Sequence, residues 1–201
     1  MQPLPSGLGA EFYTRPVVAA ARDLVGCVLT HGETGGVIVE TEAYHHSEPA
    51  CHAYVGLTSR TSTLFGPPGI AYVYRSYGIH ALLNAVCEGE EVGAAVLLRA
   101  LEPLSGIELM RRRRGGLARD RDLCSGPGKL TQALGIELSD NRSDLSRGAL
   151  RISARPPGCD APAIIADRRI GITRAVELPW RFCAADSRFL SRPASRWAEA
   201  A

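Results

Sequence analysis

The chain has 201 residues, of which 45% are hydrophobic and 22% are charged, and its formal net charge at pH 7 is +2. These values are typical of one globular domain and exclude a mainly disordered chain. The longest apolar runs are too short to cross a bilayer, and the first residues lack the layout of a signal peptide. We therefore expect a single domain over residues 1–201, with short flexible tails at about 1–9 and 191–201. The expected location is the cytoplasm or nucleoid, or the nucleus of a eukaryote.

Charge is distributed unevenly along the chain. Residues 1–100 carry 5 basic and 9 acidic side chains, a net charge of −4, whereas residues 101–201 carry 18 basic and 12 acidic side chains, a net charge of +6. A basic half suits a polyanionic partner. Arginine supplies 22 of the 23 basic residues, so Lys129 is the only lysine.

The hydrophobic and turn patterns predict strands joined by hairpins, with few helices. A helix is expected over residues 16–24, and a second one from Ser105 to about Arg112, with Ser105 and Glu108 spaced as a capping box. A turn is expected at residues 32–36 and a long polar loop at 45–69. Strands are expected at 27–29, 37–44, 70–75, 79–87 and 94–101, and short ones near 150–153, 170–172 and 180–184. This order favours an α+β fold around an antiparallel sheet.

Two carboxylates and a tyrosine alternate near the end of one predicted strand. Because successive strand residues point to opposite faces, Glu40, Glu42 and Tyr44 share one face. This spacing fits a carboxylate general base beside an aromatic platform. It also fits a solvent-facing polar edge of the sheet, and the spacing alone favours this second interpretation.

The possible metal ligands do not follow a known spacing. Six cysteines are present without any CxxC or CxxH pair, which argues against a structural zinc site and favours free, mostly buried thiols. His45, His46, Cys51 and His52 could cluster around a transition metal. Their spacing fits no standard zinc pattern, so ordinary loop residues are the simpler interpretation.

Three of the six tyrosines fall within a short segment. Tyr72 and Tyr74 share one face of a predicted strand, and Tyr77 stands beside Gly78 at the following turn. An aromatic side chain exposed at a hairpin tip suits insertion between nucleic-acid bases. A cross-strand aromatic cluster in the core would produce the same pattern, and the spacing does not separate the two interpretations.

Two basic features could contact phosphates. The segment Cys124–Lys129 combines small residues, a lysine and the start of a predicted helix, which together can hold a phosphate, although the Walker A pattern is missing. A tight turn without a ligand is the alternative. The run Arg111–Arg114, with Arg119 and Arg121, could neutralise phosphates or form the solvated end of a helix.

Taken together, these segments resemble the mammalian-type 3-methyladenine (alkyladenine) DNA glycosylase family. The similarity extends in one order over nearly the whole chain, through Gly36–Tyr44, His52, Arg60, Phe65–Gly69, Tyr72–Asn84, Val96–Pro103 and Leu123–Leu134. It implies one mixed domain with a curved, open-barrel-like antiparallel sheet, flanking helices and a protruding hairpin that enters the DNA minor groove. It also implies hydrolysis of the N-glycosidic bond of alkylated or deaminated purines in double-stranded DNA, without a metal or organic cofactor.

The resemblance assigns catalytic and pocket roles to matching positions. It makes Glu42 the general base and Arg99 the residue that helps to position the attacking water. The pocket for the flipped base is assigned to Tyr44, His52, Tyr74, Asn84 and Ile172. In this assignment Asn84 obstructs the 2-amino group of normal guanine, and Ile172 presents its main-chain carbonyl to the water.

The same resemblance assigns contacts with DNA outside the pocket. Tyr77 would fill the gap that the flipped base leaves in the stack. Contacts with the DNA backbone are assigned to Arg60, Ser125, Gly126 and Lys129. The sequence departs from the family pattern at Thr61, where Asn is frequent, and at Leu64, where many members have Met. Both departures bear on lesion preference rather than on the chemistry.

The chemistry also limits the kind of glycosylase. A base must leave the stack before C1′ can be attacked, so base flipping is required. Glycosylases that also cut the strand form a Schiff base through an amine, and the only lysine belongs to the predicted phosphate loop. We therefore predict a monofunctional enzyme, acting as a monomer, that leaves an abasic site. The alternatives are a damaged-DNA-binding protein without turnover and a metal-dependent hydrolase that uses the histidines.

Overall fold

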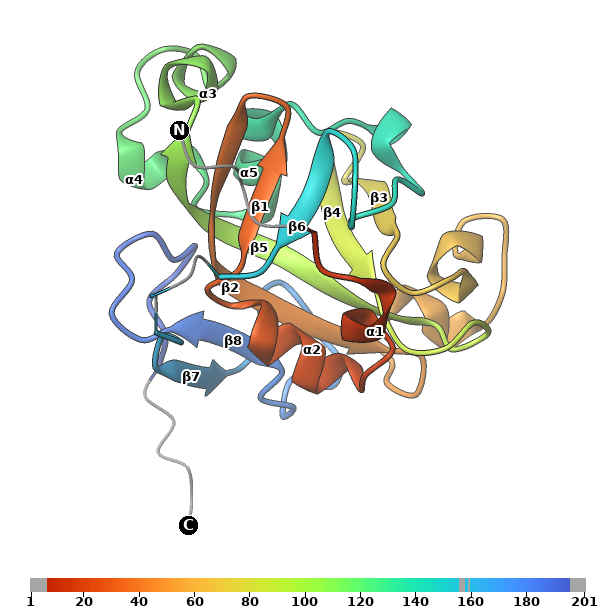
Figure 1. The fold of residues 1–201 in the computed structure, drawn as a ribbon. Coiled ribbons are helices and arrows are strands. Elements are labelled where there is room, and N and C mark those ends of the chain that lie inside the picture. Colours follow the sequence, from red (N-terminus) through yellow and green to blue (C-terminus); the bar gives the residue numbers. More distant parts are fainter. Residues whose placement is uncertain (1–6, 156–157, 159, 196–201) are drawn as a thin grey trace.

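The computed structural model describes residues 7–155, 158 and 160–195. In these residues eight antiparallel strands form one curved sheet, flanked by a few helices (Figure 1). The strands are β1 (Val28–His31), β2 (Thr34–His45), β3 (Ala71–Ser76), β4 (His80–Val86), β5 (Ala94–Ser105), β6 (Leu150–Ser153), β7 (Ile164–Asp167) and β8 (Arg181–Ala184). Their order is β3-β4-β5-β2-β1-β6, with β8 paired to β2 and β7 paired to β8. The predicted α+β fold with an antiparallel sheet is confirmed.

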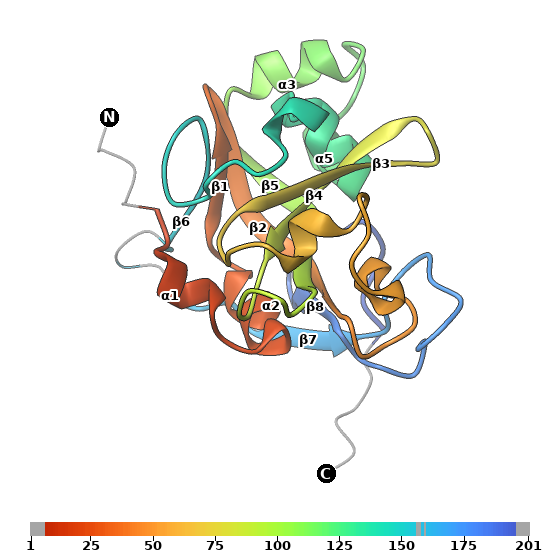
Figure 2. The same cartoon turned by 90° about the vertical axis from the view of Figure 1, so that its right-hand side faces the viewer.

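The helices are short (Figures 1 and 2). The α-helices are α1 (Ala10–Tyr13), α2 (Val17–Leu24), α3 (Ile107–Arg113), α4 (Asp120–Leu123) and α5 (Pro127–Leu134). Helix α2 packs against β2, whereas α5 packs against β4 and β5. Three 3-10 helices are η1 (His52–Val55), η2 (Ser62–Phe65) and η3 (Leu138–Asp140). None of the helices in the described ranges has the length and apolar character needed to cross a membrane.

Strand β2 is the strand around which the site is built. Its first residues pair with β1, its residues Glu40–Glu42 pair with β8, and β5 lies along its other edge. The pairing of β2 with β5 is interrupted three times: Val39 is an extra residue in β2, and Arg99 and Leu104 are extra residues in β5. Bulges of this kind bend strands and redirect side chains, and they recur beside active sites.

The two faces of β2 have different surroundings. Thr41 points toward α2, where its hydroxyl donates to the Ala21 carbonyl at 2.7 Å. The apolar side of α2, including Leu24, is buried in the main hydrophobic core. Because strand side chains alternate, this packing directs Glu40 and Glu42 to the opposite face. Both carboxylates are fully buried there, so the interpretation of this face as a solvent-facing polar edge is wrong.

The hairpin of β3 and β4 ends in a tight turn at the edge of the molecule (Figure 2). The Ile79 amide donates to the Ser76 carbonyl at 3.0 Å, and both central residues of this turn have positive φ, 49° at Tyr77 and 71° at Gly78. Glycine adopts this conformation freely, but a tyrosine does so only at a cost in backbone strain. The Tyr77 side chain is nevertheless 92% exposed.

Several predicted elements differ from those observed. The first turn is shorter than predicted, because β1 and β2 continue to His31 and Thr34. The predicted capping box is wrong: Ser105 ends β5, and α3 follows Gly106, whose φ is 67°. The predicted strand at 170–172 is also wrong. Ile170 and Gly171 form bends, Ile172 has no regular structure, and the strand that pairs with β8 lies earlier in the chain, in β7.

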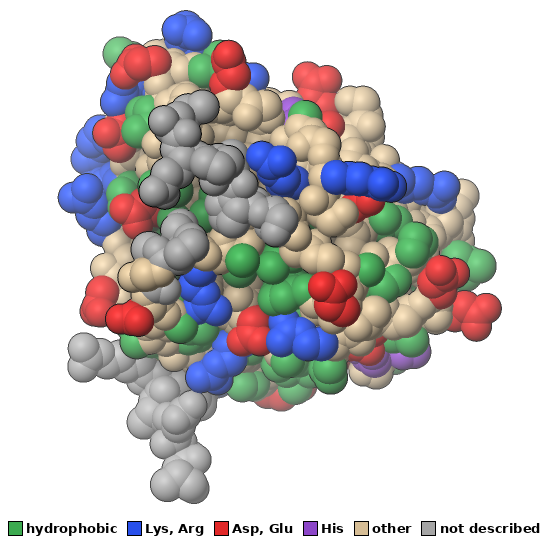
Figure 3. All heavy atoms as spheres, viewed as in Figure 1, with side chains coloured by type: hydrophobic (Ala, Val, Ile, Leu, Met, Phe, Trp, Pro, Cys, Tyr) green, Lys and Arg blue, Asp and Glu red, His purple; other side chains and the backbone are tan. Residues whose placement is uncertain are grey.

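The arginine run lies in α3 and the segment after it, where basic and acidic side chains mingle on the surface (Figure 3). Arg111 forms ion pairs with Glu108 and Asp120, and both Arg119 and Arg121 lie beside Asp122. These intramolecular pairs fit the solvated end of a helix better than a phosphate-binding cluster.

Candidate active site

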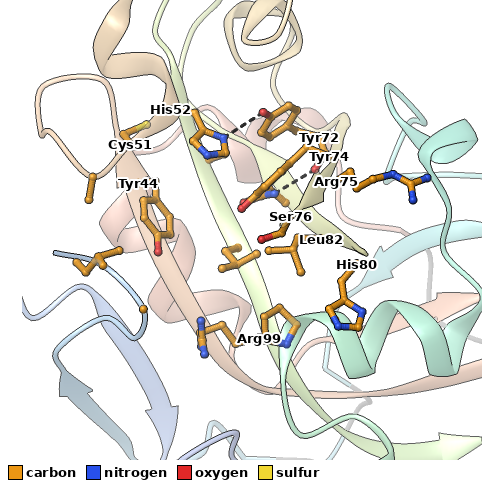
Figure 4. A pocket seen from close by; sticks show the side chains of 18 of the residues that line it. Tyr44, Cys51, His52, Tyr72, Tyr74, Arg75, Ser76, His80, Leu82 and Arg99 are labelled. Atoms are coloured by element: carbon orange, nitrogen blue, oxygen red, sulfur yellow. Dashed lines mark hydrogen bonds between the residues drawn. The ribbon is translucent and has the colours of Figure 1, made fainter. Parts of the chain in front are cut away.

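A cavity of about 530 Å³ opens between β2, the β3–β4 hairpin and the loop that follows β7 (Figure 4). Aromatic side chains form much of its wall: Tyr44, His52, Tyr72 and Tyr74. Its polar groups include Arg60, Asn84 and Arg99. A cavity of this size with aromatic walls is typical of a site for a small planar ligand.

Glu42 lies directly behind this wall. Its Oε2 accepts hydrogen bonds from the Tyr44 hydroxyl (2.8 Å) and Arg99 Nη1 (3.2 Å), and its Oε1 accepts one from the Ile170 amide (2.7 Å). The residues that supply these three donors all line the cavity. Glu42 is therefore fully buried and linked to the cavity by three contacts.

Burial and charge set the protonation of this group. Burial raises the pKa of Glu42 above its ordinary value, although the Arg99 guanidinium, the Ile170 amide and the Tyr44 hydroxyl all favour its ionised form. Burial also raises the pKa of Tyr44, whose hydroxyl stays protonated and donates to Glu42. For Arg99, burial opposes the charge, but Glu42 and Glu40 outweigh it and raise its pKa, so the guanidinium stays charged.

Glu40 has a different environment from Glu42. Its Oε1 accepts from Arg99 Nε (2.9 Å), Arg181 Nε (2.8 Å) and the Ser191 hydroxyl (2.7 Å), and its Oε2 accepts from the Ser191 amide (2.6 Å). Burial opposes its ionisation, but Arg99 and Arg181 together lower the pKa of Glu40. Of its three donor residues only Arg99 lines the cavity, whereas all three donor residues of Glu42 do.

Three aromatic residues on one side of the cavity hold each other in place. The rings of Tyr72 and Tyr74 are stacked, with centroids 5.2 Å apart, and the His52 ring meets Tyr74 edge-on at 4.6 Å. His52 Nδ1 lies 3.2 Å from the Tyr72 hydroxyl. Burial and the nearby Arg60 lower the pKa of His52, which favours a neutral ring. Asn84 donates to the Tyr72 carbonyl at 3.1 Å, which fixes its amide at the cavity wall.

Tyr44 is supported by a second buried ion pair. Arg169 donates to both oxygens of Glu48, at 2.6 and 3.0 Å, and to the Ala43 carbonyl at 3.0 Å. Its guanidinium lies 4.6 Å from the centre of the Tyr44 ring. This contact positions the tyrosine that lies across the cavity from Tyr74 (Figure 4).

The residues predicted to contact DNA lie around this cavity or near it. Arg60 and Tyr77 line it, and so do Pro127 and Gly128 at the start of α5. Lys129 is exposed, with its Nζ 3.4 Å from the Ser125 hydroxyl. Gly126 precedes the helix with a φ of 143°. Ile172 also lines the cavity, but in this loop it is Ile170 whose amide reaches Glu42.

The histidines do not gather into a metal site. Within the described ranges no group of three or more His, Cys, Asp or Glu residues is placed to hold a metal ion. His45 bonds to Ser47 and lies 3.5 Å from Glu88, whereas His52 turns to Tyr72. Cys51 is buried, and burial raises the pKa of its thiol to about 11. The five cysteines in this part of the chain are free and buried, and Cys159 lies outside it.

The last described segment is tied to the site. Ser191 bonds to Glu40, the Arg192 carbonyl accepts from Arg181 Nη2 at 2.6 Å, and Ser195 donates to Asp167 through its amide and its hydroxyl. Residues 191–195, which belong to the expected C-terminal tail, are thus joined to the sheet by hydrogen bonds. Residues 196–201 lie outside the described part, as do residues 1–6 of the expected N-terminal tail.

Sequence reasoning missed several residues of this arrangement. Tyr72 shares the spacing that drew attention to Tyr74, and that signal could have placed it in the pocket. No local pattern indicates the others, because they reach β2 from far along the chain: Arg169, Ile170, Arg181 and Ser191.

Comparison with known proteins identifies the class to which this site belongs. Residues 11–188 match the family Methylpurine-DNA glycosylase (MPG). The chain is 54% identical over 185 residues to a protein of Rhodopseudomonas palustris named "Putative 3-methyladenine DNA glycosylase", covering 92% of this chain and 88% of the relative. Proteins with the same name from Bradyrhizobium diazoefficiens and Rubrobacter xylanophilus are 54% and 56% identical, over 92% and 80% of this chain and 91% and 84% of theirs. The chain therefore belongs to the methylpurine-DNA glycosylase family of hydrolases, which cleave N-glycosyl bonds in DNA.

Proposed function

We propose that this protein is a monofunctional DNA glycosylase that flips alkylated or deaminated purines out of duplex DNA and hydrolyses their N-glycosidic bond with a water activated by Glu42. The observation that carries this proposal is the buried carboxylate of Glu42, held by Arg99 and Tyr44 at the back of an aromatic cavity. The names of the relatives, which specify 3-methyladenine, support the substrate class.

The places of the donor residues favour Glu42 over Glu40 as the base. Among the described residues, Glu42 Oε1 accepts one hydrogen bond and keeps an acceptor position for a water, and all three donor residues of Glu42 line the cavity. Two of the three donor residues of Glu40, Arg181 and Ser191, do not line it. Glu42 takes a proton from the water as the oxygen bonds to C1′, and the purine leaves with the electron pair of the C–N bond. Its negative charge also stabilises the developing oxocarbenium ion.

The cavity walls favour a flat and electron-poor base. Tyr44 faces Tyr74 across the cavity, and stacking contributes about 1–3 kcal/mol per base. An alkylated purine with a positive charge gains further from the electron-rich tyrosine faces. Such a base is also a good leaving group. Hypoxanthine must instead be protonated as it leaves, and the neutral His52 is poorly suited to supply the proton, so we expect neutral lesions to be excised more slowly.

Contacts outside the cavity would hold the distorted duplex from the minor-groove side. Arg60 at the cavity, and Ser125, Gly126 and Lys129 beside α5, are the proposed phosphate contacts. None of these contacts requires a second copy of the chain, which fits a monomer. The exposed position of Lys129 also fits an enzyme that forms no Schiff base with the sugar.

The proposed function is tested by incubating the protein with alkylated duplex DNA in EDTA and identifying the released bases by chromatography. We expect free methylated purines and intact strands that break only on later alkali treatment. Borohydride is expected to trap no covalent protein–DNA adduct. Tight lesion binding without base release would instead identify a damage-binding protein, and activity that EDTA abolishes would identify a metal-dependent hydrolase.

The fall in rate on the acid side of the pH–rate profile should report the protonation of Glu42. The base must be ionised, and burial raises its pKa above the ordinary 4.5, so kcat/KM for a cationic lesion should begin to fall with decreasing pH already above 4.5. The rate constant of base release, measured between pH 4.5 and 8 on DNA containing 7-methylguanine, checks this. A rate that stays flat down to pH 4.5 would contradict the assignment.

Tyr77 is proposed to fill the space of the flipped base, which would explain why a strained and exposed tyrosine occupies the turn. We expect Tyr77→Ala to weaken binding to lesion-containing DNA by about 5- to 100-fold, from the loss of one stacking interaction, without lowering thermal stability. Tyr77→Phe should bind like the wild type. Leu117, which is 96% exposed after α3, supplies the control Leu117→Ala. Equal affinities of Tyr77→Ala and Leu117→Ala would exclude the wedge.

A further inference from the structure

We propose that Ser191 is a positioning residue of the glycosylase reaction, whose hydroxyl fixes the Arg99 guanidinium between Glu40 and Glu42. This inference rests on the proposed function of Glu42 as the base. It gives a role to a segment whose sequence suggests only a short tail.

The contacts of Arg99 show why a third partner matters. Its Nε donates to Glu40 Oε1 (2.9 Å), its Nη1 donates to Glu42 Oε2 (3.2 Å), and its Nη2 donates to the Ser191 hydroxyl (3.3 Å). The guanidinium is a rigid planar fork, so its orientation is fixed when each of its three nitrogens has a partner. The Arg99 side chain is only 8% exposed, and water is therefore a poor substitute for a lost acceptor.

The Ser191 hydroxyl bonds to both Arg99 and Glu40 and so connects the two charged side chains. It accepts from Arg99 and donates to Glu40 Oε1 at 2.7 Å. Removing it leaves Arg99 Nη2 without this acceptor and Glu40 without one of its donors. Arg99 can then turn toward Glu40, and its contact with Glu42, the longer of its two contacts with carboxylates, is the first to weaken. Small displacements of groups around a reacting centre cost large factors in rate.

Backbone contacts keep Ser191 at this place. Its own amide donates to Glu40 Oε2 at 2.6 Å. One residue later the Arg192 carbonyl accepts from Arg181 Nη2, and Ser195 bonds to Asp167. Arg181 in turn donates to both Glu40 and Asp167. The segment 191–195 is thus held by hydrogen bonds to the buried charged side chains, and this network extends through Arg99 to Glu42.

The charges around Glu42 define the direction of the expected change. Arg99 is the cation in contact with Glu42, and Glu40 and Arg181 lie beside them. The other titratable or charged groups near it are Tyr44 of β2, Tyr74 of β3, Arg169 after β7 and Cys183 of β8. A weaker contact with Arg99 stabilises the ionised form of Glu42 less, so the acid limb of the rate profile moves to higher pH.

The experiment compares Ser191→Ala, Ser191→Thr and a matched control, Ser187→Ala, in the full chain. Ser187 lies between β8 and Ser191, and among the described residues its hydroxyl has a single hydrogen-bond partner, the Phe189 amide, which donates to it at 3.2 Å. The readouts are the single-turnover rate of 7-methylguanine release against pH, the enzyme concentration at half-saturation and the melting temperature. For Ser191→Ala we expect a rate about tenfold lower, an acid limb at higher pH and unchanged half-saturation. Ser191→Thr, which keeps the hydroxyl, and Ser187→Ala should behave like the wild type.

Three results would overturn this role. The first is a Ser191→Ala protein with wild-type rate and acid limb. The second is a rate loss whose acid limb does not move, which would indicate a structural contribution alone. The third is a Ser191→Thr protein as impaired as Ser191→Ala. Glu42→Gln serves as the reference: if it keeps wild-type activity, the proposed function of Glu42 fails, whereas if it is inactive and Ser191→Ala is normal, only the role of Ser191 fails.

Discussion

Glu42→Gln is expected to lower the single-turnover rate of base release by about 10²- to 10⁴-fold, the range that general acid–base groups contribute. The amide has the size of the carboxylate, but it accepts no proton and carries no charge to stabilise the sugar cation. Binding to DNA that contains a lesion should persist, because the aromatic walls and Tyr77 are unchanged. Base release from alkylated duplex, together with gel-shift affinity for the same DNA, measures both effects.

Glu40→Gln is the matched control for this variant. Both carboxylates are fully buried on one face of β2, and both bind Arg99. Because Glu40 pairs with Arg181 as well and is held by Ser191, neither of which lines the cavity, we expect its replacement to lower the free energy of unfolding more than the rate per folded molecule. The reverse pattern, with Glu40→Gln inactive and Glu42→Gln active, would move the base to Glu40.

Arg99→Ala is expected to lower the free energy of unfolding by about 3–5 kcal/mol, because it leaves the buried Glu42 without an ion-pair partner. For a domain of this size that corresponds to a melting temperature lower by about 6–20 °C. The variant should also be inactive, since the proposed position of the water depends on this guanidinium. Chemical denaturation at pH 7 gives the stability, and base release gives the activity.

Two companion variants test the physical cause. In Arg99→Ala combined with Glu42→Gln the unpaired charge is gone, so part of the lost stability should return while activity stays absent. Arg111→Ala removes an arginine that pairs with Glu108 and Asp120 at the surface, and such pairs contribute about 0–1 kcal/mol. A loss of stability in Arg111→Ala as large as in Arg99→Ala would show that burial of the pair is not the cause.

Local patterns in the sequence predicted the elements that hold the site. The alternation of Glu40, Glu42 and Tyr44 placed them on one face of a strand, and the structure keeps them there. The spacing of Tyr72 and Tyr74, followed by Tyr77 beside Gly78, predicted a strand with an aromatic face and a turn. These features depend on contacts between near neighbours in the chain. The alternation of side chains along a strand was therefore sufficient to predict them.

Two predicted elements that the structure does not contain show where local patterns fail. The apolar residues around Ile172 predicted a strand, but β7 pairs with β8 in its place. Ser105 and Glu108 had the spacing of a capping box, but β5 continues to Ser105 because Gly35 of β2 pairs with it. In both places pairing with a distant strand outweighed the local preference.

The sequence by itself determined the fold class, the strands of the site and, through resemblance, the family. Only the tertiary structure decided that the face of Glu40 and Glu42 is buried and which of the two carboxylates is held by residues of the cavity wall alone. That distinction depends on Arg181 and Ser191, which lie 141 and 151 residues from Glu40 in the chain. A buried charge needs hydrogen-bonding and ion-pair partners, and strand pairing brings these partners together from distant parts of the chain. No spacing within β2 encodes that choice, because the donors that distinguish its two carboxylates belong to β8 and the segment that follows it.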